Sequence, residues 1–123
     1  MNVKPRVLVV EDDPNVATVM EFLLAETGYE CTIAPTGHDG IRCARREEFD
    51  LVILDINLPG LNGFDVCAWL KQDFRFQRTP IIFVSGRLND DDRRRAFAFG
   101  ADFIAKPFDA GYFTEKISAR VRN

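Results

Sequence analysis

The segment LVILDINLPGLNG, residues 51–63, joins a run of four large apolar residues to a single carboxylate, Asp55, and then to a loop that contains proline and glycine. An uninterrupted apolar run of this length is typical of a parallel strand that is covered on both faces of a sheet. Similar runs occur at residues 7–10 and 81–84. The three runs therefore predict buried strands of one parallel sheet.

Two further segments predict shorter or more exposed strands. Residues 30–34 alternate between polar and apolar side chains and stop before Pro35, which is typical of a strand near the edge of a sheet. Residues 103–105 form a short apolar run that local propensity alone would also allow at a helix end. The chain thus contains five candidate strands.

Apolar residues at helical spacing fill the segments between these strands. Asp13, Pro14 and Gly28 suit the cap, first turn and end of the first helix. The other predicted helices begin near Thr36, Gly63, Asn89 and Asp109. Since strand and helix alternate five times, we predict an α/β fold: a single doubly wound, five-stranded parallel sheet with five helices. The alternation does not show the strand order, for which we expect the flavodoxin-like order 2-1-3-4-5. We assign residues 1–123 to this one domain.

Composition and charge restrict the functional class. The chain has 123 residues, a net charge of −3 and a hydrophobic content of 46%, as expected for one soluble domain. A nucleic-acid-binding protein usually carries a basic excess, so we predict no direct binding of nucleic acid. No apolar run is long enough to span a membrane, and Met1–Pro5 lack the apolar stretch of a secretory leader, so we expect a cytoplasmic location.

Cysteine and histidine give no sign of a metal or redox site. Cys31, Cys43 and Cys67 are widely spaced, and no CxxC pair occurs, so we predict three reduced thiols in the core. His38 is the only histidine, and we predict that it lies on the surface. A phosphohistidine donor, if one is used, would therefore come from another protein.

Two other stretches predict surface or packing features. Residues 90–92 are aspartates and residues 93–95 are arginines, so they can pair along a helix as a self-neutralised solvated face, with a partner-binding face as the alternative. Phe74 and Phe76 lie in a polar stretch and predict half-buried packing residues, with an exposed interface pair as the alternative.

Polar side chains stand where the apolar runs end. In an open α/β sheet, ligands bind beyond the carboxyl ends of the parallel strands, and these ends meet at one edge. The sequence therefore directs three carboxylates, one hydroxyl and one ammonium to a common place. These groups belong to Glu11, Asp12, Asp55, Ser85 and Lys106.

Such a cluster needs a compensating charge. Two carboxylates about 4 Å apart repel each other by about 4 kcal/mol at an effective dielectric constant near 20, and Lys106 alone leaves a negative surplus. An all-oxygen site with few protein ligands suits Mg²⁺, and Mn²⁺ can substitute. A carboxylate at such a site can act as a nucleophile and form an acyl phosphate, for which Asp55 is the natural candidate. The cation, Lys106 and the Ser85 hydroxyl would then each hold one phosphoryl oxygen.

Taken together, four motifs resemble the receiver domains of two-component response regulators, the family that includes chemotaxis regulators. The motifs are VLVVEDDP (7–14), LVILDINLPGLNG (51–63), IIFVSG (81–86) and FIAKPF (103–108). Each motif alone is weakly specific, but all four occur in order and at the right spacing. The resemblance covers residues 6–121.

The resemblance implies a role for each site residue. Asp55 would be the phosphoacceptor, and Lys106 would contact the phosphoryl group. Mg²⁺ would be bound by Asp12 directly, by Glu11 through water, by Asp55, and by the backbone carbonyl of Asn57. Ser85 and Phe103 would be the two switch residues, and the Lys106–Pro107 bond would be cis. We further predict that Asn57 and Arg87 tune the lifetime of the phosphorylated state.

The resemblance also implies the partners. A sensor histidine kinase or a histidine phosphotransfer protein would supply the phosphoryl group. An output target or an attached domain would read the change through the fourth helix, fifth strand and fifth helix, with homodimerisation as a further option. The domain would catalyse only its own phosphorylation and dephosphorylation, so we do not class it as an enzyme.

Three other functions fit parts of the pattern. A flavodoxin-like cofactor module needs a phosphate-binding loop after the first strand, where this chain has three acidic residues. A phosphatase of the haloacid-dehalogenase family needs DxDxT after that strand, whereas Asp55 is followed by INL. A degenerate receiver that only binds partners remains an alternative, although the site is complete.

Overall fold

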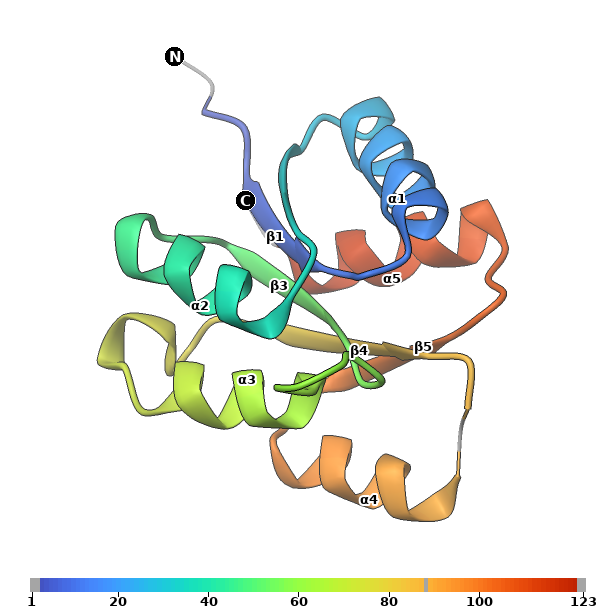
Figure 1. The fold of residues 1–123 in the computed structure, drawn as a ribbon. Helices are drawn as coiled ribbons and strands as arrows, with labels where there is room; N and C mark the ends of the chain where they lie inside the picture. The colour runs from blue at the N-terminus through green and yellow to red at the C-terminus, as the bar shows by residue number, and fades with distance from the viewer. Residues whose placement is uncertain (1–2, 88, 122–123) are drawn as a thin grey trace.

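Five parallel strands form the centre of the molecule, in the order β2-β1-β3-β4-β5 (Figure 1). The computed structural model describes residues 3–87 and 89–121, so the ends of the predicted domain, residues 1–2 and 122–123, lie outside the described residues. The strands are β1 (Arg6–Val10), β2 (Glu30–Ala34), β3 (Leu51–Asp55), β4 (Ile81–Ser85) and β5 (Asp102–Ala105). The predicted fold class and strand order are confirmed, with β3 in the middle and β2 at an edge.

The described residues also form five α-helices and one 3-10 helix, of which the first five lie between strands and the last follows β5. These helices are α1 (Pro14–Glu26), α2 (Gly37–Arg46), α3 (Gly63–Lys71), η1 (Phe74–Phe76), α4 (Asp90–Ala98) and α5 (Ala110–Arg120). Each α-helix is preceded by a polar side chain that accepts a hydrogen bond from a backbone N–H of the first turn, which fixes where the helix starts. These capping residues are Asp13, Thr36, Asn62, Asn89 and Asp109. After α1, Gly28 adopts a φ of +90°, which a residue with a side chain rarely adopts.

The sheet separates two apolar cores because successive side chains of a strand point to opposite faces. Figure 1 shows α1 and α5 on one face, and α2, α3 and α4 on the other. In β1, for example, Val7 and Val9 pack with α1 and α5, whereas Leu8 and Val10 pack with α2 and α3. Burial on both faces explains why β1, β3 and β4 read as continuous apolar runs in the sequence.

Two arginines of helix α4 contact aromatic rings of the domain. The only buried side chain of α4 is Ala96. The guanidinium carbon of Arg93 lies 5.6 Å from the ring centroid of Phe103, and that of Arg95 lies 4.0 Å from the ring centroid of Phe64. Arg94 alone pairs with an aspartate of the same helix, at 3.6 Å. The predicted self-neutralised face is therefore wrong for two of the three arginines, which pack on aromatic rings.

The aromatic pair of η1 is split between core and surface. Phe76 is fully buried, whereas 81% of Phe74 is exposed, so the prediction of two half-buried residues was wrong for both. Lys71 stabilises this segment: its ammonium donates to the backbone carbonyls of Phe76, Gln77 and Thr79.

The predictions for cysteine and histidine are mostly confirmed. All three cysteines are free; Cys67 is buried, and Cys31 and Cys43 are half-buried. Burial raises the pKa of each thiol, which disfavours the reactive thiolate. His38 is exposed. Within residues 3–87 and 89–121, no helix has the length and apolar character that a membrane span requires.

Candidate functional site

The ends of four strands bring the predicted polar residues together at one edge of the sheet. Asp55 ends β3, and Ser85 ends β4. Glu11 directly follows β1, and Lys106 directly follows β5. The parallel register aligns these ends, since Asp55 lies opposite Val84 and Ser85 lies opposite Ala105. The meeting of distant residues therefore follows from the sheet topology.

Lys106 bridges the two buried carboxylates. Its Nζ lies 2.8 Å from Glu11 Oε1 and 3.0 Å from Asp55 Oδ2. Glu11 is 2% exposed and Asp55 is 4% exposed, so water screens these charges poorly. Burial raises the pKa of Glu11 to about 7, although Lys106 opposes the shift. Burial alone would lower the pKa of Lys106, but its close contacts with the Glu11 and Asp55 carboxylates outweigh that effect and raise the pKa.

The acidic residues fit a hard divalent cation. Glu11, Asp12 and Asp55 each offer one carboxylate oxygen, and these oxygens all lie within 4.8 Å of one another. Glu11 Oε1 is the one buried side-chain oxygen among the described residues without a directed hydrogen bond, even though Lys106 Nζ is close enough for an ion pair. Carboxylate oxygens are the ligands that Mg²⁺ prefers. The donor set and the orphaned oxygen therefore suit Mg²⁺.

The Ser85 hydroxyl is held in a network beside this cluster. The side chain is fully buried, and its Oγ donates to the backbone carbonyl of Arg87 at 2.9 Å. It accepts from the Arg87 N–H and from Asn57 Nδ2, both at 3.0 Å. The Asn57 N–H in turn donates to Asp55 Oδ1 at 3.0 Å. Asn57 thus links the Asp55 carboxylate to the Ser85 hydroxyl. Arg87 joins this network only through its backbone, and the Arg87 side chain is exposed.

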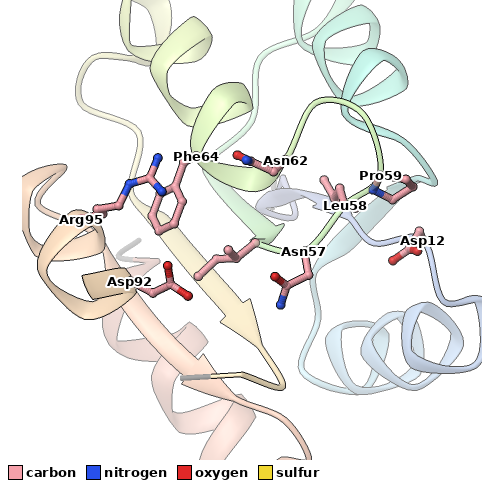
Figure 2. A pocket seen from close by; sticks show the side chains of 9 residues that line it. Asp12, Asn57, Leu58, Pro59, Asn62, Phe64, Asp92 and Arg95 are labelled. Carbon is pink, nitrogen blue, oxygen red and sulfur yellow. The ribbon is translucent and has the colours of Figure 1, made fainter. Parts of the chain in front are cut away.

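An open cleft of about 590 Å³ adjoins the site. Figure 2 shows Asp12 on one side of this cleft, Asn57 in the middle, and Asp92 and Arg95 of α4 on the other side. Of the three clustered carboxylates, Asp12 lines this cleft, so the cleft reaches the edge of the cluster. The site is therefore open to an incoming reactant while the nucleophile candidate stays buried.

Comparison with known proteins decides the family. The response regulator receiver domain matches residues 7–118. This chain belongs to that family. As a receiver domain it is a component of two-component signalling, and the resemblance of its four motifs is confirmed.

Relatives of this receiver domain include longer response regulators. It is 35% identical over 118 residues to the response regulator ArlR of Staphylococcus saprophyticus, and 36% identical over 118 residues to ArlR of Staphylococcus aureus. The matches cover 95% of this chain but 50% and 51% of those two relatives. The chain thus spans about half the length of the curated relatives it matches.

Solved structures of other receiver domains have the same fold. The chemotaxis protein CheY4 of Vibrio cholerae has a TM-score of 0.90 at 25% identity, covering 98% of this chain and all of that one (100%). The receiver domain of the sensor histidine kinase PA1611 from Pseudomonas aeruginosa has a TM-score of 0.87 at 28% identity, covering 97% and 98% of the two chains. The PA1611 structure holds a magnesium ion in its active-site cleft.

Some site features were visible in the sequence, and others were not. The receiver motifs implied a cis Lys106–Pro107 bond, which is present. Phe103 is half-buried, and the Arg93 guanidinium lies over its ring. Sequence reasoning missed the contact of Arg95 with Phe64 and the place of Asp92 beside the cleft. No local pattern signals these contacts, because they depend on how α4 packs against α3.

Proposed function

We propose that this receiver domain accepts a phosphoryl group on Asp55 from a sensor histidine kinase or a histidine phosphotransfer protein, in a reaction that requires Mg²⁺. The observation that carries the proposal is the buried Asp55 carboxylate, which Lys106 holds at 3.0 Å beside the other two carboxylates of the cluster. We propose that residues 1–123 form one domain with this function. We also propose that the domain acts in the cytoplasm. The phosphorylated state would be read by an output target or by an attached output domain; the chain spans about half the length of the longer relatives.

Asp55 is the nucleophile in the proposed step. One of its carboxylate oxygens attacks the phosphorus, the phosphorus–nitrogen bond of the donor phosphohistidine breaks, and the imidazole nitrogen keeps that electron pair and takes up a proton. Asn57 and Lys106 orient the attacking carboxylate, because each donates to a different oxygen of it. Lys106 can then follow the transferred group and neutralise one of its oxygens.

Mg²⁺ would be held by Asp12, Asp55 and the backbone carbonyl of Asn57, with Glu11 acting through a water molecule; Mn²⁺ can substitute. When bound, the cation supplies the positive charge that neutralises the carboxylates and the phosphoryl oxygens. Support comes from the fit of the carboxylate oxygens and from the magnesium ion in the PA1611 receiver domain. The domain modifies only itself, so we class it as a signalling phosphoacceptor.

Phosphorylation would act through Ser85 and Phe103. The Ser85 hydroxyl would exchange the Arg87 carbonyl for a phosphoryl oxygen, which pulls the β4–α4 connection toward Asp55. Phe103 would then turn inward and leave Arg93, which changes the α4-β5-α5 face. An output target, an attached domain or a second copy of the receiver would read this face.

The experiment is intact-mass measurement after incubation with Mg²⁺ and acetyl phosphate. We expect the wild type to gain one phosphoryl group, the Asp55→Asn variant to gain none, and a chelator to abolish the gain. Asp50→Asn is the matched control, because it changes the same atoms in an exposed aspartate outside the site and should label normally. Absence of labelling under conditions that label another receiver domain would favour a binding module that works without phosphorylation.

Arg87→Ala is expected to shorten the lifetime of the phosphorylated domain. Arg87 follows Ser85 by two residues and its side chain is exposed, so we propose that it shields the phosphoryl group from outside and that its removal would open a path for the attacking water. We expect dephosphorylation to accelerate about fivefold, which corresponds to about 1 kcal/mol in the barrier. The loss of phosphorylated protein with time gives the dephosphorylation rate. Arg78→Ala serves as the control, because Arg78 is an exposed arginine that precedes β4, whereas Arg87 follows it. An unchanged dephosphorylation rate for Arg87→Ala would show that Arg87 does not control the lifetime of the phosphorylated domain.

A further inference from the structure

A second hollow lies between α2 and α3, which run side by side on one face of the sheet (Figure 1). It has a volume of about 320 Å³. We call it the α2–α3 groove, and it is lined by His38, Ile41, Arg42, Arg45, Leu61 and Trp69. None of these residues lines the cleft beside Asp55. The receiver function described above leaves the groove without a role.

One wall of the groove is a basic stripe. His38, Arg42 and Arg45 follow one another at spacings of four and three residues, which puts them on the same side of α2. Arg42 is paired with Asp39 at 2.9 Å, but Arg45 has no ion pair within the described part of the chain. None of the lining residues is acidic, although the whole chain carries a net charge of −3. The groove is thus a local positive site on an acidic domain.

The rest of the groove is apolar. Trp69, the only tryptophan of the chain, is half-exposed on α3, and the Arg45 guanidinium carbon lies 5.3 Å from its ring centroid. Ile41 and Leu61 contribute aliphatic surface beside it. Tryptophan and arginine are the residues that most often dominate the energy of a protein–protein interface. An apolar floor with a cationic edge suits a ligand that combines apolar side chains with carboxylates.

We propose that the α2–α3 groove binds an acidic, amphipathic peptide segment of a partner protein. A carboxylate of the segment pairs with Arg45, which has no ion pair within the described residues, and an apolar side chain packs on Trp69. A groove between two adjacent helices accepts an amphipathic segment along its length. A nucleic acid fits less well, because the basic stripe is short, the domain is acidic, and aliphatic side chains flank the tryptophan.

The groove adjoins the loop that follows the phosphorylation strand. Leu61 belongs to the β3–α3 connection, and the first turn of α2 packs tightly on it: a Cβ atom added to Gly37 would lie 2.6 Å from the Leu61 carbonyl oxygen. A bound segment would therefore contact the loop that starts at Asp55. The groove itself is present in the unphosphorylated protein, so its binding is tested without any phosphoryl transfer.

Trp69 provides the readout. The fluorescence of the unphosphorylated full chain is titrated with a synthetic amphipathic helix of leucine and glutamate, and with the same peptide carrying glutamine for glutamate. We expect a saturable change with the glutamate peptide, weakened by added salt, and at least tenfold weaker binding of the glutamine peptide. Arg45→Glu should weaken binding of the glutamate peptide at least tenfold, whereas Arg94→Glu, the same change on exposed α4, should not.

Three outcomes would overturn the assignment. The first is the absence of a saturable fluorescence change up to about 1 mM peptide, a concentration at which only very weak association would go undetected. The second is equal binding of the glutamate and glutamine peptides. The third is equal binding of the glutamate peptide by Arg45→Glu and by the wild type. If a single-stranded oligonucleotide changes the fluorescence and the peptide does not, the groove takes nucleic acid instead. Urea unfolding of both variants checks that they are folded, and since Arg45 and Arg94 are exposed, their midpoints should match the wild type.

Discussion

The Lys106→Met substitution should lower the free energy of unfolding of the metal-free domain by about 3 kcal/mol at a pH well above 7. Lys106 is the cation within 3.0 Å of both Glu11 and Asp55, and the variant leaves these two buried carboxylates facing each other. Urea unfolding in the presence of a chelator measures the loss. Added Mg²⁺ should recover part of it, because the cation replaces the missing positive charge.

The size of this effect should depend on pH. Burial raises the pKa of Glu11 from 4.5 to about 7, so between these values the folded state binds more protons than the unfolded state, and stability falls as pH rises. Below about pH 7 the neutral Glu11 needs no counter-charge, so the gap between wild type and Lys106→Met should narrow there. It should widen as pH rises through about 7.

A second lysine provides the control. Lys116 is paired with Asp102 at 3.0 Å, but both side chains are partly exposed. Lys116→Met should therefore cost at most about 1 kcal/mol and show no added loss as pH rises through about 7. Equal losses for the Lys106 and Lys116 variants would mean that Lys106 does not neutralise the buried carboxylates.

The Gly63→Ala substitution should destabilise the domain by about 3 kcal/mol, the upper end for an added methyl group in a packed site. A Cβ atom at residue 63 would lie 2.4 Å from the Asp55 carbonyl oxygen and 3.0 Å from the Ile56 Cα. These are backbone atoms, so no side-chain rotation can make room. The same shift would displace Asp55, so phosphorylation with acetyl phosphate should also slow down.

The sign of this effect makes the measurement decisive. In a helix without steric conflict, alanine is about 1 kcal/mol more favourable than glycine, so an unhindered Gly63→Ala would stabilise the domain. Gly86→Ala is the matched control for stability, because its nearest neighbouring atom lies at 3.9 Å. A Gly63→Ala variant as stable as the wild type in urea would contradict the close approach of α3 to the end of β3.

Local patterns in the sequence were enough to predict the helices, the strands and the α/β class. The five predicted strands and five predicted helices matched the observed elements within about two residues, because strands and helices depend on side-chain period and on near neighbours along the chain. The parallel arrangement then placed Glu11, Asp55, Ser85 and Lys106 at one edge. Their roles in phosphoryl transfer stay predictions until the labelling experiment is done.

The contacts across the site could not be predicted in this way. The sequence does not indicate that Ser85 is held by the Arg87 backbone and by Asn57, or that Arg93 and Arg95 pack on Phe103 and Phe64.

The sequence also did not predict which phenylalanine of η1 is buried or that a groove opens beside Trp69. The sequence by itself determined the elements, their order and the polar groups at the strand ends. Only the tertiary structure decided which side chains meet, which ring is buried and where a groove opens, because these depend on helix packing between residues that are distant in the chain.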